Sequence, residues 1–154
     1  MERSNMKTMK YALLVSTLFS GVVWAQNVSD AWVRPAVKGQ MATGAFMNIT
    51  AKENSKLLSV SSPIAGVVEI HEMKMDKDVM KMSALTDGLE LPAGKTVELK
   101  PGGHHIMLMD LKEPLLTDGT VPMTLTFVDA KGNKSTQELK VPVKSMTSHA
   151  HHKH

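Results

Sequence analysis

The chain has 154 residues, a formal net charge of +3, 4% aromatic residues and no cysteine. The lack of cysteine excludes thiol oxidoreductases, cysteine nucleophiles, thiolate zinc sites and blue-copper electron-transfer sites, because each of these depends on a thiolate. Few aromatic side chains and nearly balanced charge argue against nucleic-acid binding, which needs stacking platforms or a basic face. The length is that of one domain whose core needs no disulfides.

Residues 1–25 have the pattern of a secretory signal peptide. Basic residues precede the apolar run YALLVSTLFSGVVWA, which ends in a small-residue cleavage pattern at Val23 and Ala25. The run is about 15 residues, whereas a membrane-spanning helix needs about 20. We therefore expect export, cleavage after Ala25 and no membrane anchor after processing, with a retained anchor as the alternative. Met6 is an alternative start, and removal of residues 1–25 leaves a net charge of about +1.

The rest of the chain consists of short runs of strand-forming residues, separated by Pro and Gly, without a long stretch at helical spacing. The sequence DAKGN at 129–133 is a hairpin signal. This pattern predicts an all-β sandwich or barrel over 26–143, followed by a flexible tail over 144–154. The predicted strands are 30–36, 44–51, 55–62, 66–75, 79–85, 95–100, 104–111, 121–128 and 135–143.

Side-chain alternation divides the strand predicted at 104–111 into two faces. Ile106 and Leu108 fall on one face with His104, and His105 falls on the other with two methionines, Met107 and Met109. Branched apolar side chains belong in the core, so we expect the imidazole and thioether groups of the second set to face outward.

Two further predicted strands repeat this pattern. In 66–75, Val68 and Ile70 are expected to point inward, and the opposite face carries Glu69, His71, Met73 and Met75. In 79–85, Met80 and Met82 share a face. Exposed apolar groups of this kind are unfavourable unless they serve a function. By contrast, the methionines expected to fill gaps in the core are Met41, Met47 and Met123.

Binding of a soft metal ion is a chemistry that would use exposed thioethers beside imidazoles. Thioethers are polarisable donors that select Cu(I), and imidazole adds affinity. Enzyme chemistry is poorly supported, because the sequence has no G-x-S-x-G nucleophile elbow and His71 does not begin an H-E-x-x-H zinc motif.

The ordered set His71, Met82, His105 and Met107 resembles the motif of the PCuAC periplasmic copper chaperones, which is H, ten residues, M, twenty-one residues, H-x-M. Ten residues separate His71 from Met82, but twenty-two separate Met82 from His105. The extra residue can lie in the Gly- and Pro-rich loop between 88 and 103. It leaves His104 as an alternative third ligand, although an isoleucine would then take the place of the last methionine. The stretches AWVRPA, TGAFMNI, EIHEM, LPAGKTVELKPGGHHIMLMDLKEPL and VPMTLTF extend the resemblance over most of 30–143.

The resemblance implies a cupredoxin-like Greek-key β-barrel or sandwich that binds one Cu(I) near its surface through His71, Met82, His105 and Met107. It further implies a monomeric, non-enzymatic periplasmic chaperone that passes copper to acceptors such as Sco-type proteins or oxidase subunit II during cytochrome c oxidase assembly. The alternatives are a copper buffer for tolerance and a secreted β-sandwich that binds a partner without metal. The last alternative would bind no Cu(I) under reducing, anaerobic conditions.

The C-terminal tail holds a second set of potential ligands, which is rich in imidazole and poor in sulfur. Such a composition favours Cu(II) over Cu(I), and we expect a separate Cu(II) site there, with a purification remnant or a non-binding end as the alternatives. The residues of this set are Met146, His149, His151, His152 and His154.

Overall fold

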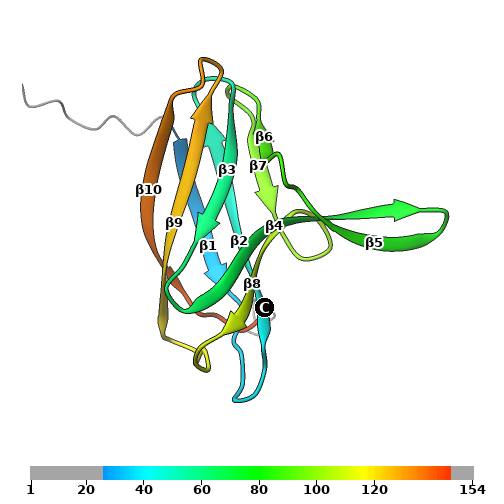
Figure 1. The fold of residues 1–154 in the computed structure, drawn as a ribbon, viewed down its shortest axis with the longest axis vertical. Coiled ribbons are helices and arrows are strands. Elements are labelled where there is room, and N and C mark those ends of the chain that lie inside the picture. Colours follow the sequence, from blue (N-terminus) through cyan, green and yellow to red (C-terminus); the bar gives the residue numbers. More distant parts are fainter. Residues whose placement is uncertain (1–25, 147–154) are drawn as a thin grey trace, which may run out of the picture.

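The computed structural model describes residues 26–146, so the predicted signal peptide and the four tail histidines lie outside the described residues. Within this range, ten strands form two antiparallel sheets that pack face to face (Figure 1). No helix in this range is long and apolar enough to cross a bilayer. The strands are β1 (Gln26–Val33), β2 (Ala42–Ala51), β3 (Ser55–Ser61), β4 (Ala65–Asp76), β5 (Val79–Ala84), β6 (Leu89–Leu91), β7 (Thr96–Leu99), β8 (His105–Leu111), β9 (Thr120–Asp129) and β10 (Lys134–Pro142).

The predicted all-β sandwich is confirmed. The larger sheet has the order β1-β2-β8-β4-β5, with β7 also paired to β2, and the smaller sheet has the order β10-β9-β3-β6. Each of the nine predicted strands overlaps an observed one, and β6 is the one described strand without a predicted counterpart. Strand β6 has three residues, which is too short for alternation to be recognised.

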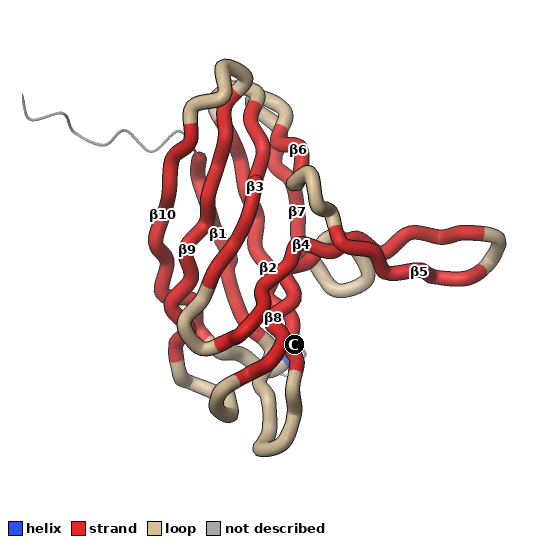
Figure 2. Tube along the Cα trace, viewed as in Figure 1, coloured by secondary structure: helices blue, strands red, loops and turns tan. Residues whose placement is uncertain are grey.

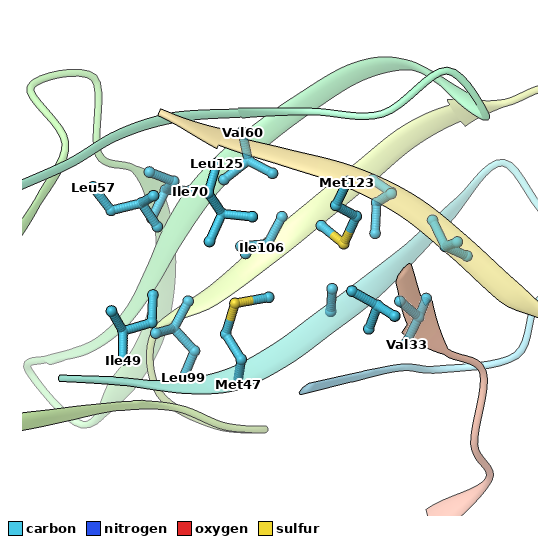
Figure 3. Close-up of a cluster of buried hydrophobic side chains, with 14 of the residues drawn as sticks. Val33, Met47, Ile49, Leu57, Val60, Ile70, Leu99, Ile106, Met123 and Leu125 are labelled. Atoms are coloured by element: carbon cyan, nitrogen blue, oxygen red, sulfur yellow. The ribbon is translucent and has the colours of Figure 1, made fainter. Parts of the chain in front are cut away.

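The core lies between the two sheets, and Figure 3 shows part of it. Ile106 and Leu108 of β8 are fully buried there, as alternation predicted. Met47 and Met123 are also buried, so their prediction as core residues is confirmed. The same prediction is wrong for Met41, which is 57% exposed because it precedes β2 in a connecting segment.

Strands β4 and β5 together form an arm that leaves the body of the sandwich (Figures 1 and 2). The first part of β4, from Ala65 to His71, pairs with β8, whereas the part from His71 to Asp76 pairs with β5. Every residue of β5 is exposed. The arm turns at Lys77 and Asp78, which have φ values of 49° and 65°, and a two-residue type I′ turn requires positive φ at both positions.

Candidate metal centre

A cavity of about 260 Å³ lies on the outer face of the larger sheet, near the base of the arm. The fold brings together three of the four ligands predicted from the sequence. This cavity is lined by Met82 from β5 and by His105 and Met107 from β8. Met73 of β4 also lines it, directly opposite Met82 in the strand register.

The fourth predicted ligand, His71, stands directly opposite His105 in the pairing of β4 with β8. The two ring centroids are 5.6 Å apart, with one ring edge-on to the other. Two imidazoles that share one ion through metal–nitrogen bonds of about 2.0 Å have centroids no more than about 6.5 Å apart. The spacing of this pair therefore fits a shared ion.

His105 lies on the outer face of its strand, but the expectation that this whole face is exposed is wrong, because His105 is only 6% exposed. The Phe46 ring on β2 lies 6.4 Å from its ring, and His71 covers another side. Pro101 and Gly102, from the loop before β8, line the same cavity. Phe46 and His71 are distant from His105 in sequence, so alternation along β8 could not reveal this burial.

Hydrogen bonds leave one nitrogen of each imidazole available. The Nε2–H of His71 donates to Glu69 Oε2 at 2.7 Å, and its Nδ1 is buried without a hydrogen-bond partner among the described residues. The Nδ1–H of His105 donates to the carbonyl oxygen of Gly103 at 3.1 Å, so its Nε2 carries the lone pair. Histidines that bind metals are held in this way, with the second nitrogen bonded to a carboxylate or a carbonyl.

Burial lowers the pKa of His105 below its ordinary value of 6.5. The hydrogen bond to the Gly103 carbonyl raises this pKa, and electrostatic interactions with His71, Arg34 and His104 lower it further, so the net direction is downward. His105 is therefore neutral near pH 7, which is the form that can bind a metal ion.

Acid should destabilise the metal-free fold through His105. The pKa of this imidazole is lower in the folded chain than in the unfolded chain, so the unfolded chain binds a proton that the folded chain does not. The stability contributed by neutral His105 is complete above about pH 6.5 and is lost as the pH falls through the lowered folded-state value. Urea denaturation at about pH 7.5 and about pH 5.5 should show a larger loss for wild type than for His105→Phe. Equal losses would contradict this assignment.

Aromatic packing supports the floor of the cavity. The ring of Phe46 lies 4.7 Å from that of Trp32, and the Arg34 guanidinium stands 5.3 Å from the centre of the Phe46 ring. A Cβ at position 44 would lie 2.9 Å from Phe46 Cζ, so the glycine there lets this ring pack over β2. Arg34 also donates from Nη2 to the Met146 sulfur at 3.6 Å, which places the end of the described chain near the cavity.

His104, the alternative third ligand, belongs to a different part of the surface. Its Nε2 lies 3.8 Å from Glu72 Oε2, and both residues line a separate cavity that contains none of the four predicted ligands. His104 immediately precedes β8, and adjacent residues of an extended chain point to opposite faces, so His104 and His105 cannot exchange roles without a shift in register.

Alternation places Glu69 and Met73 on the outward face of 66–75, but the sequence assigns neither of them a role in the site. Glu69 fixes the orientation of His71, and its position two residues earlier on the same strand face was the signal that could have identified it. Met73 lines the cavity beside Met82, and recognition of the two-residue turn at 77–78 would have paired these two methionines.

The donor groups limit which metal the site can hold. The described part of the chain contains no cluster of three or more His, Asp or Glu side chains that could hold a metal ion. The potential donors at the cavity are thioethers and the His105 imidazole, with the His71 imidazole beside it, and this donor set suits a soft monovalent ion.

Comparison with known proteins identifies relatives in sequence and in structure. The model of the LpqE-like family, described as "Putative lipoprotein LpqE-like", matches residues 27–143. The protein Lxx21020 of Leifsonia xyli subsp. xyli is 35% identical over 121 residues, which cover 79% of this chain and 70% of that protein. An uncharacterized protein of Rickettsia prowazekii is 32% identical over 110 residues, and the match spans 68% of this chain and 61% of that protein.

Two solved structures share the fold. The copper-bound PCuAC domain from PmoF2 matches with a TM-score of 0.61 at 22% identity, covering 81% of this chain and 97% of the domain. The Cu(I) form of DR1885 from Deinococcus radiodurans matches with a TM-score of 0.56 at 28% identity, covering 85% of this chain and 84% of that protein. These matches confirm the cupredoxin-like fold and the resemblance to PCuAC proteins that the sequence indicated, and the chain belongs to the LpqE-like family.

Proposed function

We propose that this protein is a carrier of Cu(I), which it holds as cargo between His71, Met82, His105 and Met107 after export. The observation that carries the proposal is the buried Nδ1 of His71, which has no hydrogen-bond partner among the described residues. The His71 ring lies beside that of His105, and His105 lines the cavity together with the thioethers. A buried nitrogen without a partner is unfavourable unless a ligand completes it. The solved relatives that hold copper or Cu(I) support the choice of ion.

The arrangement suits delivery rather than permanent storage. Met82 is 49% exposed on a strand that is exposed throughout, so an acceptor can reach one ligand of the bound ion. Thioethers are weak donors, and an acceptor with thiolates can replace them one bond at a time. We propose that acceptors of this kind include Sco-type proteins or oxidase subunit II, and that the ion is transferred without chemical turnover.

A transfer experiment tests the carrier against the two alternatives. Protein loaded anaerobically with one equivalent of Cu(I) is mixed with a reduced dithiol copper acceptor, and the copper content of each is measured after separation. A carrier should lose its Cu(I) to the dithiol through a transient complex. A copper buffer would retain the ion at equilibrium, and a binding module without metal would not load at all.

Glu69→Gln should weaken Cu(I) binding by about 10- to 100-fold. The carboxylate of Glu69 accepts the Nε2–H of His71 and thereby fixes the tautomer and the orientation of the ring. A neutral amide does this less well. Competition with a Cu(I) chelator measures the affinity. The matched control is Glu90→Gln on β6, whose carboxylate pairs with Lys56, and it should leave the affinity unchanged. An unchanged affinity in Glu69→Gln would contradict this role.

A further inference from the structure

The arm formed by β4 and β5 separates two kinds of side chain on its two faces. Met73 lies directly opposite Met82, and Met75 lies directly opposite Met80. Because side chains alternate along a strand, these four methionines share the face of the arm that carries His71. Lys74 and Lys81, also directly opposite each other, occupy the other face. The arm therefore presents a ladder of two methionine pairs.

The outer pair has no structural role in the core. Met75 is 62% exposed and Met80 is 45% exposed, near the end of an arm that reaches away from the sandwich (Figure 1). Exposed methionines bury little apolar area here, and β-branched residues would stabilise a two-stranded ribbon better. Packing therefore does not account for these two residues.

The spacing of the outer pair suits a soft ion. Side chains directly opposite in an antiparallel ribbon have Cβ atoms about 4.5 to 5.5 Å apart. Two flexible thioethers starting from that distance can both reach one ion at metal–sulfur bonds of about 2.3 Å. The inner pair, Met73 and Met82, is two residues away from the outer pair on each strand. It therefore lies about 7 Å closer to the sandwich than the outer pair does.

We propose that Met75 and Met80 form a second, outer site for Cu(I) or another soft monovalent ion, from which the ion passes by Met73 and Met82 to the cavity at His105. This inference rests on the proposed function of the inner site. Thioethers are neutral and carry no proton, so each step exchanges one sulfur ligand for the next without transfer of protons or electrons. The outer site binds more weakly, because it has two thioethers and no imidazole. Ions therefore move inward during loading.

Titration with Ag(I), a soft monovalent ion, can be followed at individual residues by NMR of methionine methyl groups labelled with 13C. The first equivalent should shift the methyl signals of Met82 and Met107, and a second equivalent should shift those of Met75 and Met80. Met41 is a matched internal control, because it is an exposed methionine far from the arm in sequence, and its signal should not move at the same Ag(I) concentration.

The double variant Met75→Leu/Met80→Leu should lose the second equivalent and keep the first with unchanged affinity, since leucine conserves side-chain volume. If the methyl signals of Met75 and Met80 stay fixed while those of Met82 and Met107 shift, this inference is overturned and the proposed function of the cavity is not. If the signals of Met75 and Met80 move together with that of Met41, the inference is also overturned, because Ag(I) would then bind exposed thioethers in general. Inner signals that never shift would instead overturn the proposed function of the cavity.

Discussion

Replacing His105 with phenylalanine should reduce Cu(I) affinity by about 100-fold or more, because the loss of a direct ligand costs at least as much as the loss of a group that orients one. Phenylalanine keeps a ring against Phe46 and His71. It loses the hydrogen bond to the Gly103 carbonyl, so the free energy of unfolding of the metal-free protein should fall by no more than about 2 kcal/mol. Anaerobic competition with a Cu(I) chelator and urea denaturation measure the two effects.

His104→Phe is the matched control for this variant. His104 is adjacent in sequence but lies beside Glu72 in a separate cavity, so its replacement should leave Cu(I) affinity unchanged. If His104→Phe abolished binding while His105→Phe retained it, the assignment of the third ligand would be reversed. A variant His105→Phe that failed to fold would show that the imidazole is needed for structure.

Replacing both Met82 and Met107 with leucine should remove the stabilisation that copper gives to the folded protein. The double loss should weaken Cu(I) binding by more than about 1000-fold, because half of the proposed donors are absent. Free Cu(I) at 100 times its dissociation constant should stabilise the wild type by about 2.7 kcal/mol, and the same concentration should stabilise the variant hardly at all. Thermal unfolding with and without Cu(I) measures the difference.

Met41→Leu/Met109→Leu controls for the removal of two methionines. Met109 lies two residues beyond Met107 on the same face of β8, and neither Met41 nor Met109 lines the cavity. This control should keep the full copper-dependent shift in Tm. Equal loss of the shift in both double variants would mean that Cu(I) binds methionines without regard to their position.

The sequence predicted the fold well, because most of the signal is local. Alternation within 104–111 identified Ile106 and Leu108 as core residues, and both are fully buried. The glycine at the hairpin signal 129–133 has a φ of 84°, and Asp129 accepts hydrogen bonds from two backbone N–H groups of that turn. Turn chemistry and period-two patterns need no information from distant residues.

The parts that sequence could not predict depend on contacts between distant segments. Alternation gives the face on which His105 lies, but its burial depends on Phe46 from another strand. The separation of β4 from the sandwich at His71 also has no local signature, since the methionines of the arm continue the same alternation. Lys77 and Asp78 form its turn with positive φ but lack the usual Asn-Gly signal.

The coordination of bound Cu(I) tests the central claim most directly. X-ray absorption at the copper edge, measured on anaerobic protein loaded with one equivalent of Cu(I), distinguishes sulfur from nitrogen neighbours. The proposed site predicts two sulfur ligands at about 2.3 Å and two imidazole nitrogens at about 2.0 Å, with the sulfur contribution lost in Met82→Leu/Met107→Leu. A first shell of nitrogen and oxygen alone, identical in wild type and in this double variant, would contradict the claim that the thioether-lined cavity at His71 and His105 holds the ion.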